Sequence, residues 1–324
     1  MEQLVSIIIP TYNRAHLIGQ TLDSVCAQTY EHWECIVVDD GSSDYTKELL
    51  AFYTEKDARI QYHNRPSDRP KGANACRNYG FELSTGKFIQ WFDSDDLMVS
   101  SYYRDCIIHF EKNKNLDLVL TNYDIFRDSD KVIFHRQRNV ITNLSLDYFT
   151  GKINFGTPHC VWKKSVVADF VFDTLLTRAQ ELDFHFKILS SKRITWSCLD
   201  HTAVLVRRHV DSITSSYHAG FYKPMQSELK VRRAILKYLY TNKYNLEHLK
   251  DALNIYVKGF EKFCKSVSLK RILAELRCLE QINLFTQNYY RWKIELILLI
   301  FAYKMWHRTY RLKTHLNKLD RNLA

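Results

Sequence analysis

Short apolar runs alternate with amphipathic segments over the first hundred residues. The apolar runs predict buried strands at residues 5–9, 34–38, 60–63 and 88–92. Apolar residues at helical spacing between them predict helices at residues 15–28, 45–56 and 74–83. This alternation indicates crossover units and a parallel sheet, so we predict an α/β fold. Ligands should bind beyond the carboxyl ends of the strands, where the loops after residues 9, 38 and 92 begin.

The pattern is less regular from residue 101 to residue 219. It favours strands at 116–122 and 131–135, an edge strand at 203–208, and helices starting at 144 and covering 181–191. From residue 225 on, heptad-like apolar spacing predicts helices almost to the end. We therefore divide the chain into a body, residues 1–219, and a helical C-terminal region, residues 220–324.

Charge divides the chain at the same place. The 324 residues include 46 Lys and Arg against 36 Asp and Glu, a net charge of +10. Residues 1–219 hold 25 basic and 28 acidic side chains, whereas residues 220–324 hold 21 and 8. A basic surplus is typical of nucleic-acid-binding proteins, but no RNP, zinc-finger or homeodomain pattern accompanies it. We expect no nucleic-acid partner.

The N-terminus and the cysteines bear on localisation. Residues 1–10 lack the basic region and cleavage site of a signal peptide, and the eight cysteines form no CxxC pair. We expect a cytoplasmic protein with reduced thiols. The longest apolar run, residues 296–303, would give about 12 Å of helix against a bilayer core of about 30 Å, so we expect no membrane-spanning helix.

Three acidic clusters stand at predicted loops and at one helix start: Asp39 with Asp40; Asp93, Asp95 and Asp96; Glu181 with Asp183. Carboxylates on convergent loops repel each other, and Mg²⁺ or Mn²⁺ is the usual compensation because it prefers oxygen ligands and bridges protein to phosphate. The alternative is that each aspartate caps a helix or fills a turn. Three clusters on one sheet favour a metal-dependent reaction at phosphate.

Four motifs then follow one another in order. They are residues 5–14 (VSIIIPTYNR), 37–44 (VVDDGSSD), 72–80 (GANACRNYG) and 92–96 (FDSDD). In order and spacing they resemble family 2 glycosyltransferases of the GT-A fold, and the similarity extends more loosely to about residue 215. The resemblance implies a mixed, mainly parallel sheet flanked by helices. In it, residues 1–100 would bind the nucleotide sugar and residues 101–219 the acceptor.

The same resemblance implies a reaction. A sugar would pass with inversion from a nucleoside-diphosphate donor, most often a UDP-sugar, to an acceptor hydroxyl, with Mn²⁺ or Mg²⁺ as cofactor. The implied nucleotide-sugar residues are Pro10, Thr11, Tyr12, Arg14, Asp40, Gly72, Arg77, Asp93 and Ser94. Asp40 should accept a hydrogen bond from the base, and Arg77 should pair with Asp93 or the donor. Asp95 would bind the metal, with His209 as a second candidate ligand.

Inverting transfer also needs a carboxylate that takes the proton of the acceptor hydroxyl. Residues 179–184 (AQELDF) resemble the family's acidic pair before a helix, with Glu181 at the position of the base, where Asp is more frequent. Asp183 is the second candidate, although the helix dipole also favours an acidic residue there. His159 falls where acceptor-binding residues lie in this family.

Two further interpretations concern the reaction class and the C-terminal region. A nucleotidyltransferase or sugar-nucleotide synthase would share the sheet and carboxylates but normally has a Gly-rich basic loop where this chain has residues 11–14 (TYNR). We expect a saccharide or lipid-linked saccharide acceptor in bacterial surface polysaccharide or lipopolysaccharide synthesis. Aromatic and basic residues at 289–293 and 304–308 suit peripheral contact with an anionic membrane. Packing of these helices on the body or in an oligomer is the alternative.

Overall fold

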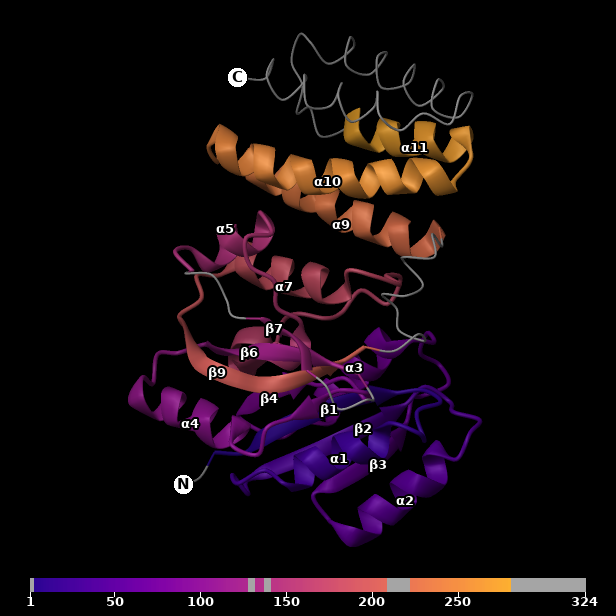
Figure 1. The fold of residues 1–324 in the computed structure, drawn as a ribbon. Coiled ribbons are helices and arrows are strands. Elements are labelled where there is room, and N and C mark those ends of the chain that lie inside the picture. The colour runs from indigo at the N-terminus through magenta and orange to yellow at the C-terminus, as the bar shows by residue number, and fades with distance from the viewer. Residues whose placement is uncertain (1–2, 128–131, 137–140, 209–221, 281–324) are drawn as a thin grey trace. The chain divides into compact units, whose positions relative to one another are not determined.

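The computed structural model describes residues 3–127, 132–136, 141–208 and 222–280 (Figure 1). The chain divides into two compact units. The first comprises Met1–Tyr148 and Lys152–Ser212, and the second comprises Phe149–Gly151 and Ile213–Ala324. His209 and the two aromatic and basic segments at 289–293 and 304–308 lie outside the described residues.

The first unit is built on a mixed sheet whose described strands run in the order β3-β2-β1-β4-β8-β6-β9-β5, with β7 paired to β6. Pairing is parallel among β3, β2, β1 and β4 and between β6 and β9, and antiparallel for β8, β5 and β7. The strands are β1 Val5–Thr11, β2 Trp33–Asp39, β3 Ile60–Asn64, β4 Phe88–Trp91, β5 Leu97–Met98, β6 Leu118–Phe126, β7 Val132–Arg136, β8 Cys160–Lys163 and β9 Trp196–Arg207. The mixed, mainly parallel sheet that the sequence predicts is confirmed.

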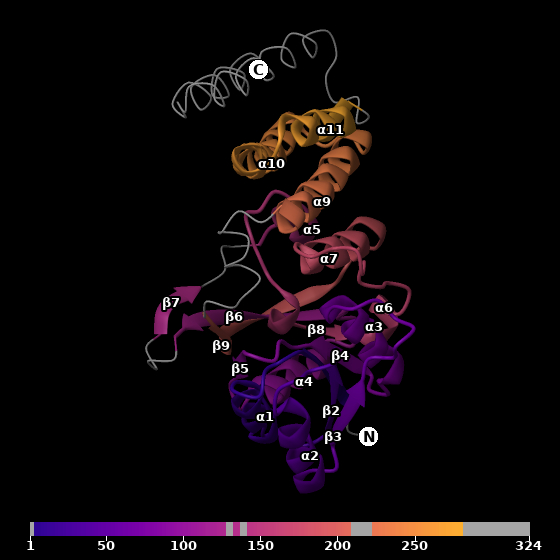
Figure 2. The same cartoon turned by 90° about the vertical axis from the view of Figure 1, so that its right-hand side faces the viewer.

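Helices cover both faces of this sheet (Figure 2). Ile7 and Cys35 belong to the cluster formed with α1, α2 and α4, whereas Ile36 and Val38 pack with α3 on the other face. Because both faces are covered, every residue of β1 and β2 is buried, which explains their continuous apolar runs. The helices of this unit are α1 Ile18–Cys26, α2 Thr46–Lys56, α3 Ala73–Leu83, α4 Tyr102–Lys112, α5 Leu144–Phe149, α6 Lys164–Val167 and α7 Gln180–Ser191, with a 3₁₀ turn, η1, at Thr157–His159.

At the amino edge of the sheet, a buried carboxylate joins β1 and β2 to the residues before β4. Glu34 accepts hydrogen bonds from Ser6 Oγ at 2.6 Å, from Thr85 N at 2.6 Å and from Gly86 N at 3.2 Å. Burial alone would raise the pKa of Glu34, but these hydrogen bonds outweigh it and lower the pKa below its ordinary value. Glu34 therefore stabilises the fold at the edge opposite the ligand-binding loops.

A strand does cover residues 203–207, as predicted, but the prediction that it lies at the edge of the sheet is wrong. Strand β9 begins at Trp196 and lies between β6 and β5. Asp200 and His201 are exposed in the middle of this strand, and its register with β6 shifts near Asn122. The irregular pairing breaks the apolar pattern, so only the last part of the strand is recognisable in the sequence.

The second unit is helical through the last described residue, as the sequence predicts. It contains α9 Tyr222–Thr241, α10 Leu246–Ser266 and α11 Leu269–Glu280. The carboxylate of Glu275 is buried, pairs with Arg233 and accepts a hydrogen bond from Tyr256 Oη at 2.9 Å, so one acidic side chain joins all three helices. None of the helices in the described residues combines the length and apolarity that crossing a bilayer requires.

Candidate active site

The loops that follow β1 and β2 at the carboxyl edge of the sheet bind each other. Asn13 Oδ1 accepts a hydrogen bond from Ser43 N at 2.8 Å, with Asn13 in a left-handed conformation (φ 52°). Asp44 accepts from Ala15 N at 3.1 Å and from Thr46 at the start of α2. These bonds fix the loop that carries Tyr12.

Asp39 and Asp40 are adjacent but have different partners. Asp39 accepts hydrogen bonds from Ser42 N at 3.0 Å and Ser42 Oγ at 2.6 Å, which closes its own turn. Asp40 forms an ion pair with Arg65, directly after β3, and accepts from Gly72 N at 2.9 Å. Gly72, with φ 126° and ψ 159°, adopts a conformation that glycine alone takes readily. Asp40 therefore joins the loop after β2 to both ends of the loop between β3 and α3, and Arg65 is a site residue that the sequence analysis missed.

An exposed ring and a buried hydroxyl stand at the end of β1. Tyr12 is 46% exposed, and Lys71 Nζ lies 5.2 Å from the centre of its ring. Thr11 Oγ1 is buried without a hydrogen-bond partner in the described part of the chain, while Thr11 O accepts from Asp40 N at 2.9 Å. Pro10 pairs with Val38 inside the sheet. A planar ligand can stack on Tyr12, and a hydroxyl donor can satisfy Thr11.

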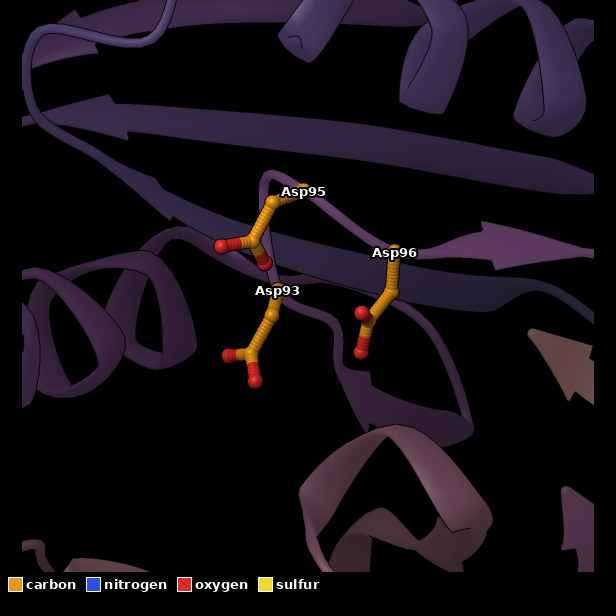
Figure 3. Close-up of side chains that lie close together, drawn as sticks. All are labelled: Asp93, Asp95 and Asp96. Carbon is orange, nitrogen blue, oxygen red and sulfur yellow. The ribbon is translucent and has the colours of Figure 1, made fainter. Parts of the chain in front are cut away.

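Three carboxylates converge on the turn after β4 (Figure 3). Oxygens of Asp93, Asp95 and Asp96 lie within 4.8 Å of one another, and Ser94 between them is buried. Carboxylate oxygens are the ligands that Mg²⁺ and Mn²⁺ prefer, and two Mg–O bonds span about 4.2 Å. The turn therefore fits a divalent cation with little adjustment.

Negative charge is poorly tolerated at this turn. Burial, followed by the charges of Asp95 and Asp93, raises the pKa of Asp96 well above its usual range. Burial also raises the pKa of Asp93, to about 6, against the opposing charge of Arg77. The carboxylates of Asp95 and Glu181 add to this rise, so Glu181 on α7 lies within electrostatic reach of the turn.

Two arginines from distant segments approach the same turn. Arg14 Nε lies 4.0 Å from Asp95 Oδ2. Arg207, at the end of β9, donates from Nε to Asp95 O and from its backbone N to Asp96 Oδ1, both at 2.9 Å. Arg207, at the end of β9, therefore stabilises the turn; it stands two residues before His209, which the sequence analysis named as a candidate ligand.

Arg77 joins the turn to α3 and α7. Its Nη2 donates to Asp93 Oδ1 at 2.9 Å, and its Nη1 donates to Asn74 Oδ1 at 3.1 Å and to Gln180 Oε1 at 3.2 Å. Only 4% of the Arg77 side chain is exposed. The structure therefore brings Arg77 and Asp93 together and adds Gln180, which the sequence analysis did not single out.

The two candidate bases differ in their partners. Asp183 Oδ2 lies 2.6 Å from Lys187 Nζ, one helical turn further along α7. Glu181 is half-buried, and no side-chain hydrogen bond or ion pair involves it among the described residues. The carboxylate of Glu181 is therefore the one available to an incoming hydroxyl.

His159 is buried in the first unit, at the end of the 3₁₀ turn η1. Its ring stacks on Tyr123 with the ring centres 4.0 Å apart, and its Nδ1 accepts from Gly156 N at 2.9 Å. His159 is 7% exposed, so its surface is taken up largely by this packing.

Comparison with known proteins gives a consistent assignment. The family model described as glycosyl transferase family 2 matches residues 6–211. The UDP-Glc:alpha-D-GlcNAc-diphosphoundecaprenol beta-1,3-glucosyltransferase WfgD of Escherichia coli is 37% identical over 132 residues, 40% of this chain and 50% of WfgD. The putative teichuronic acid biosynthesis glycosyltransferase TuaG of Bacillus subtilis is 41% identical over 95 residues, 29% of this chain and 37% of TuaG. The chain spans half or less of the length of these relatives.

Solved structures share the fold at low sequence identity. Staphylococcus aureus TarS 1–349 in complex with UDP-GlcNAc matches with a TM-score of 0.67 and 18% identity, over 86% of this chain and 81% of TarS. The mannosyltransferase PcManGT of Pyrobaculum calidifontis, in complex with GDP-Man and Mn²⁺, matches with a TM-score of 0.54 and 17% identity, over 95% of this chain and 88% of PcManGT. The fold is of the GT-A type, as the motifs imply, and with a family model matching most of its length, the chain belongs to glycosyl transferase family 2.

Proposed function

We propose that this protein transfers a sugar, with inversion, from a UDP-sugar to a hydroxyl of a growing glycan, with Mn²⁺ or Mg²⁺ bound. The observation that carries this proposal is the turn with the carboxylates of Asp93 and Asp95. The carboxylate of Glu181, which has no side-chain hydrogen bond or ion pair among the described residues, acts electrostatically on Asp93. The name of WfgD specifies a UDP-sugar donor, and TarS was solved with UDP-GlcNAc. PcManGT was solved with GDP-Man, which makes a GDP-sugar the second candidate donor.

The nucleoside would lie at the ends of β1 and β2. Tyr12 offers an exposed ring for stacking, and Thr11 offers a buried hydroxyl. Asp40 already accepts from Arg65 and Gly72, but a carboxylate has about four acceptor sites, so it retains capacity for an N–H of the base. Pro10 would shape the floor of this pocket.

The diphosphate would lie at the turn after β4. Asp95, with Asp93 and Asp96, would hold the cation, and His209 is a further proposed ligand outside the described residues. When bound, the cation neutralises charge on the leaving diphosphate. Arg14 already lies near this turn and adds positive charge there.

Glu181 would act as the base. As the acceptor oxygen attacks the anomeric carbon, its proton passes to the carboxylate of Glu181, and the bond from that carbon to the diphosphate oxygen breaks on the opposite side. Direct displacement inverts the configuration of the anomeric carbon. The ion pair of Asp183 with Lys187 makes Asp183 the weaker candidate.

The acceptor is proposed from the relatives. The name of WfgD specifies a diphosphoundecaprenol-linked acceptor, and that of TuaG specifies teichuronic acid biosynthesis. A saccharide or lipid-linked saccharide of a bacterial surface polysaccharide would suit an enzyme at the cytoplasmic face of the membrane. The 21 basic against 8 acidic side chains of residues 220–324 support peripheral contact of that region with anionic lipid, beside the catalytic domain proposed for residues 1–219.

The test is a donor screen that measures released nucleotide. We expect UDP from one UDP-sugar, in the presence of Mn²⁺ or Mg²⁺ and acceptor. Glu181→Gln should lower kcat about 10²- to 10⁴-fold, whereas Asp183→Asn should keep it within about tenfold. Full transfer by Glu181→Gln would remove that residue from the role of base. Pyrophosphate release from a nucleoside triphosphate would instead identify a nucleotidyltransferase.

A further inference from the structure

Gln180, the first residue of α7, uses both ends of its amide. Its Oε1 accepts from Arg77 Nη1 at 3.2 Å, and its Nε2 donates to Leu176 O at 3.0 Å. Only 8% of Gln180 is exposed. The side chain is therefore enclosed and oriented, and it joins α3 to the chain segment that leads into α7.

One face of α3 binds that same segment at two further points. Asn78 donates to Phe172 O at 3.0 Å and accepts from Phe172 N at 2.9 Å. Asn74 donates to Asp173 O at 2.7 Å. Asn74, Arg77 and Asn78 stand at positions i, i+3 and i+4, so they share one helix face. Residues 172–180 are therefore fastened to α3 at both ends.

The residue before Gln180 is strained. Ala179 has φ 57° and ψ 30°, a left-handed conformation that costs a residue with a Cβ about 1 kcal/mol or more. Such a conformation persists only where surrounding contacts hold it. The amide of Gln180, which binds both Leu176 O and Arg77, supplies such contacts directly before Glu181.

Arg77 carries the connection to the carboxylate turn. The same guanidinium that donates to Gln180 donates from Nη2 to Asp93 at 2.9 Å. Because the amide of Gln180 is neutral, it orients the guanidinium without neutralising it, and the positive charge remains for Asp93. A glutamate at position 180 would instead share this charge between two carboxylates.

We propose that Gln180 is a positioning residue, which fixes Glu181 relative to Asp93 by holding the first turn of α7 on Arg77. This inference rests on the proposed function, because it matters for the reaction only if Glu181 is the base. Gln180 is enclosed and both ends of its amide are already hydrogen-bonded, so it would act through Arg77 and Glu181. Its loss should therefore slow the transfer step more than it weakens nucleotide binding.

Two substitutions and a control test this role in the full-length protein. Gln180→Met removes both hydrogen bonds at similar volume, and kcat should fall about 10- to 100-fold while donor KM and UDP affinity change less than about threefold. Gln180→Glu keeps an acceptor for Arg77 but cannot donate to Leu176 O. Its kcat should therefore lie between those of wild type and Gln180→Met. Ser145→Ala removes the hydrogen bond from Ser145 Oγ to Leu189 O, 3.2 Å long, at the far end of α7, and should keep wild-type kcat.

Hydrogen exchange supplies a readout that needs no transfer. Amides 179–183 should exchange about tenfold faster in Gln180→Met than in wild type, and UDP with Mn²⁺ should slow their exchange in wild type but not in Gln180→Met. Wild-type exchange and kcat in Gln180→Met would overturn the proposal, as would a loss confined to UDP affinity. If wild type transfers no sugar, the proposed function fails, while the exchange result still decides whether Gln180 holds α7.

Discussion

Replacing Asp95 with Asn should stabilise the metal-free protein. The oxygens of Asp93, Asp95 and Asp96 lie within 4.8 Å of one another. At that distance two unit charges repel by about 3.5 kcal/mol for an effective dielectric constant of about 20. The side chain of Asp95 is 21% exposed and Arg14 lies 4.0 Å away, so solvent and the arginine cancel most of this repulsion. We expect the free energy of unfolding to rise by about 1 kcal/mol, or about 2–4 °C in Tm.

With metal the order of stability should reverse. A ligand at 100 times its Kd stabilises the state that binds it by about 2.7 kcal/mol. Wild type should gain this amount from Mn²⁺, whereas Asp95→Asn loses a ligand and should gain little. The variant would therefore be the more stable protein in EDTA and the less stable one in Mn²⁺.

The assay is thermal unfolding in EDTA and in Mn²⁺ at equal ionic strength. Asp169→Asn is the control, because the side chain of Asp169 is 80% exposed and, among the residues that the structure describes, its polar contact is an ion pair with Lys192 at 3.3 Å. It removes the same charge, should change stability by less than about 0.5 kcal/mol, and should keep the Mn²⁺ response. If Asp95→Asn is destabilised in EDTA and keeps the full Mn²⁺ response, the turn is neither repulsive nor a metal site.

Three further predictions concern the backbone, acid stability and the membrane. Gly72→Ala should cost about 1–3 kcal/mol and weaken UDP binding, because its backbone conformation is strained for any side chain; Gly19→Ala, in α1 with ordinary contacts around the added Cβ, should instead gain up to about 1 kcal/mol. The lowered pKa of Glu34 stabilises the fold above the unfolded pKa of about 4.3, and this stabilisation is lost as the pH falls through the folded pKa. The fall in Tm from pH 7 to pH 3.5 should therefore be smaller for Glu34→Gln, which is less stable at pH 7. Full-length protein should sediment with anionic liposomes at low salt and dissociate at high salt.

Each of these has a contrary outcome. Equal free energies of unfolding in urea for Gly72→Ala and wild type would mean that the loop tolerates a side chain. An unchanged acid dependence in Glu34→Gln would place the acid-labile interactions elsewhere. No sedimentation at low salt would remove membrane contact as the role of the basic C-terminal region.

The first half of the fold could be predicted because its strands are buried on both faces. Ile7 and Ile8 lie on opposite faces of β1, and both are fully buried, so the strand is apolar throughout. Strand β8, Cys160–Lys163, pairs with β4 and β6 but holds only three consecutive apolar residues, 160–162, too short a run to distinguish from a loop. Helix α4 was missed although both of its signals stand in the sequence: Tyr103, Cys106 and Phe110 follow helical spacing, and Ser101 directly before the helix is a common N-cap residue.

The site residues could be named where a motif carried them but their partners could not. The sequence indicated Asp40, Arg77 and Asp93, because each stands in a motif at a strand end or helix start. It did not indicate that Arg65 pairs with Asp40, or that Gln180, although it stands in the motif at residues 179–184, binds Arg77, since a hydrogen bond between residues 103 positions apart leaves no periodic pattern. Pairing of that kind is decided by how α3 and α7 meet, which only the folded chain specifies.

The fastening of residues 172–180 to α3 has a consequence for recombination between relatives. In a chimera, a segment 172–180 taken from another parent would have to form hydrogen bonds with three side chains of the recipient's α3, those of Asn74, Arg77 and Asn78. An insert confined to residues 113–171 leaves both α3 and residues 172–180, and therefore all of these contacts, in one parent. Chimeras with that shorter insert should therefore fold more often than chimeras whose insert extends through residue 180, and inherited variation should concentrate at 113–171 while α3 and the start of α7 change together.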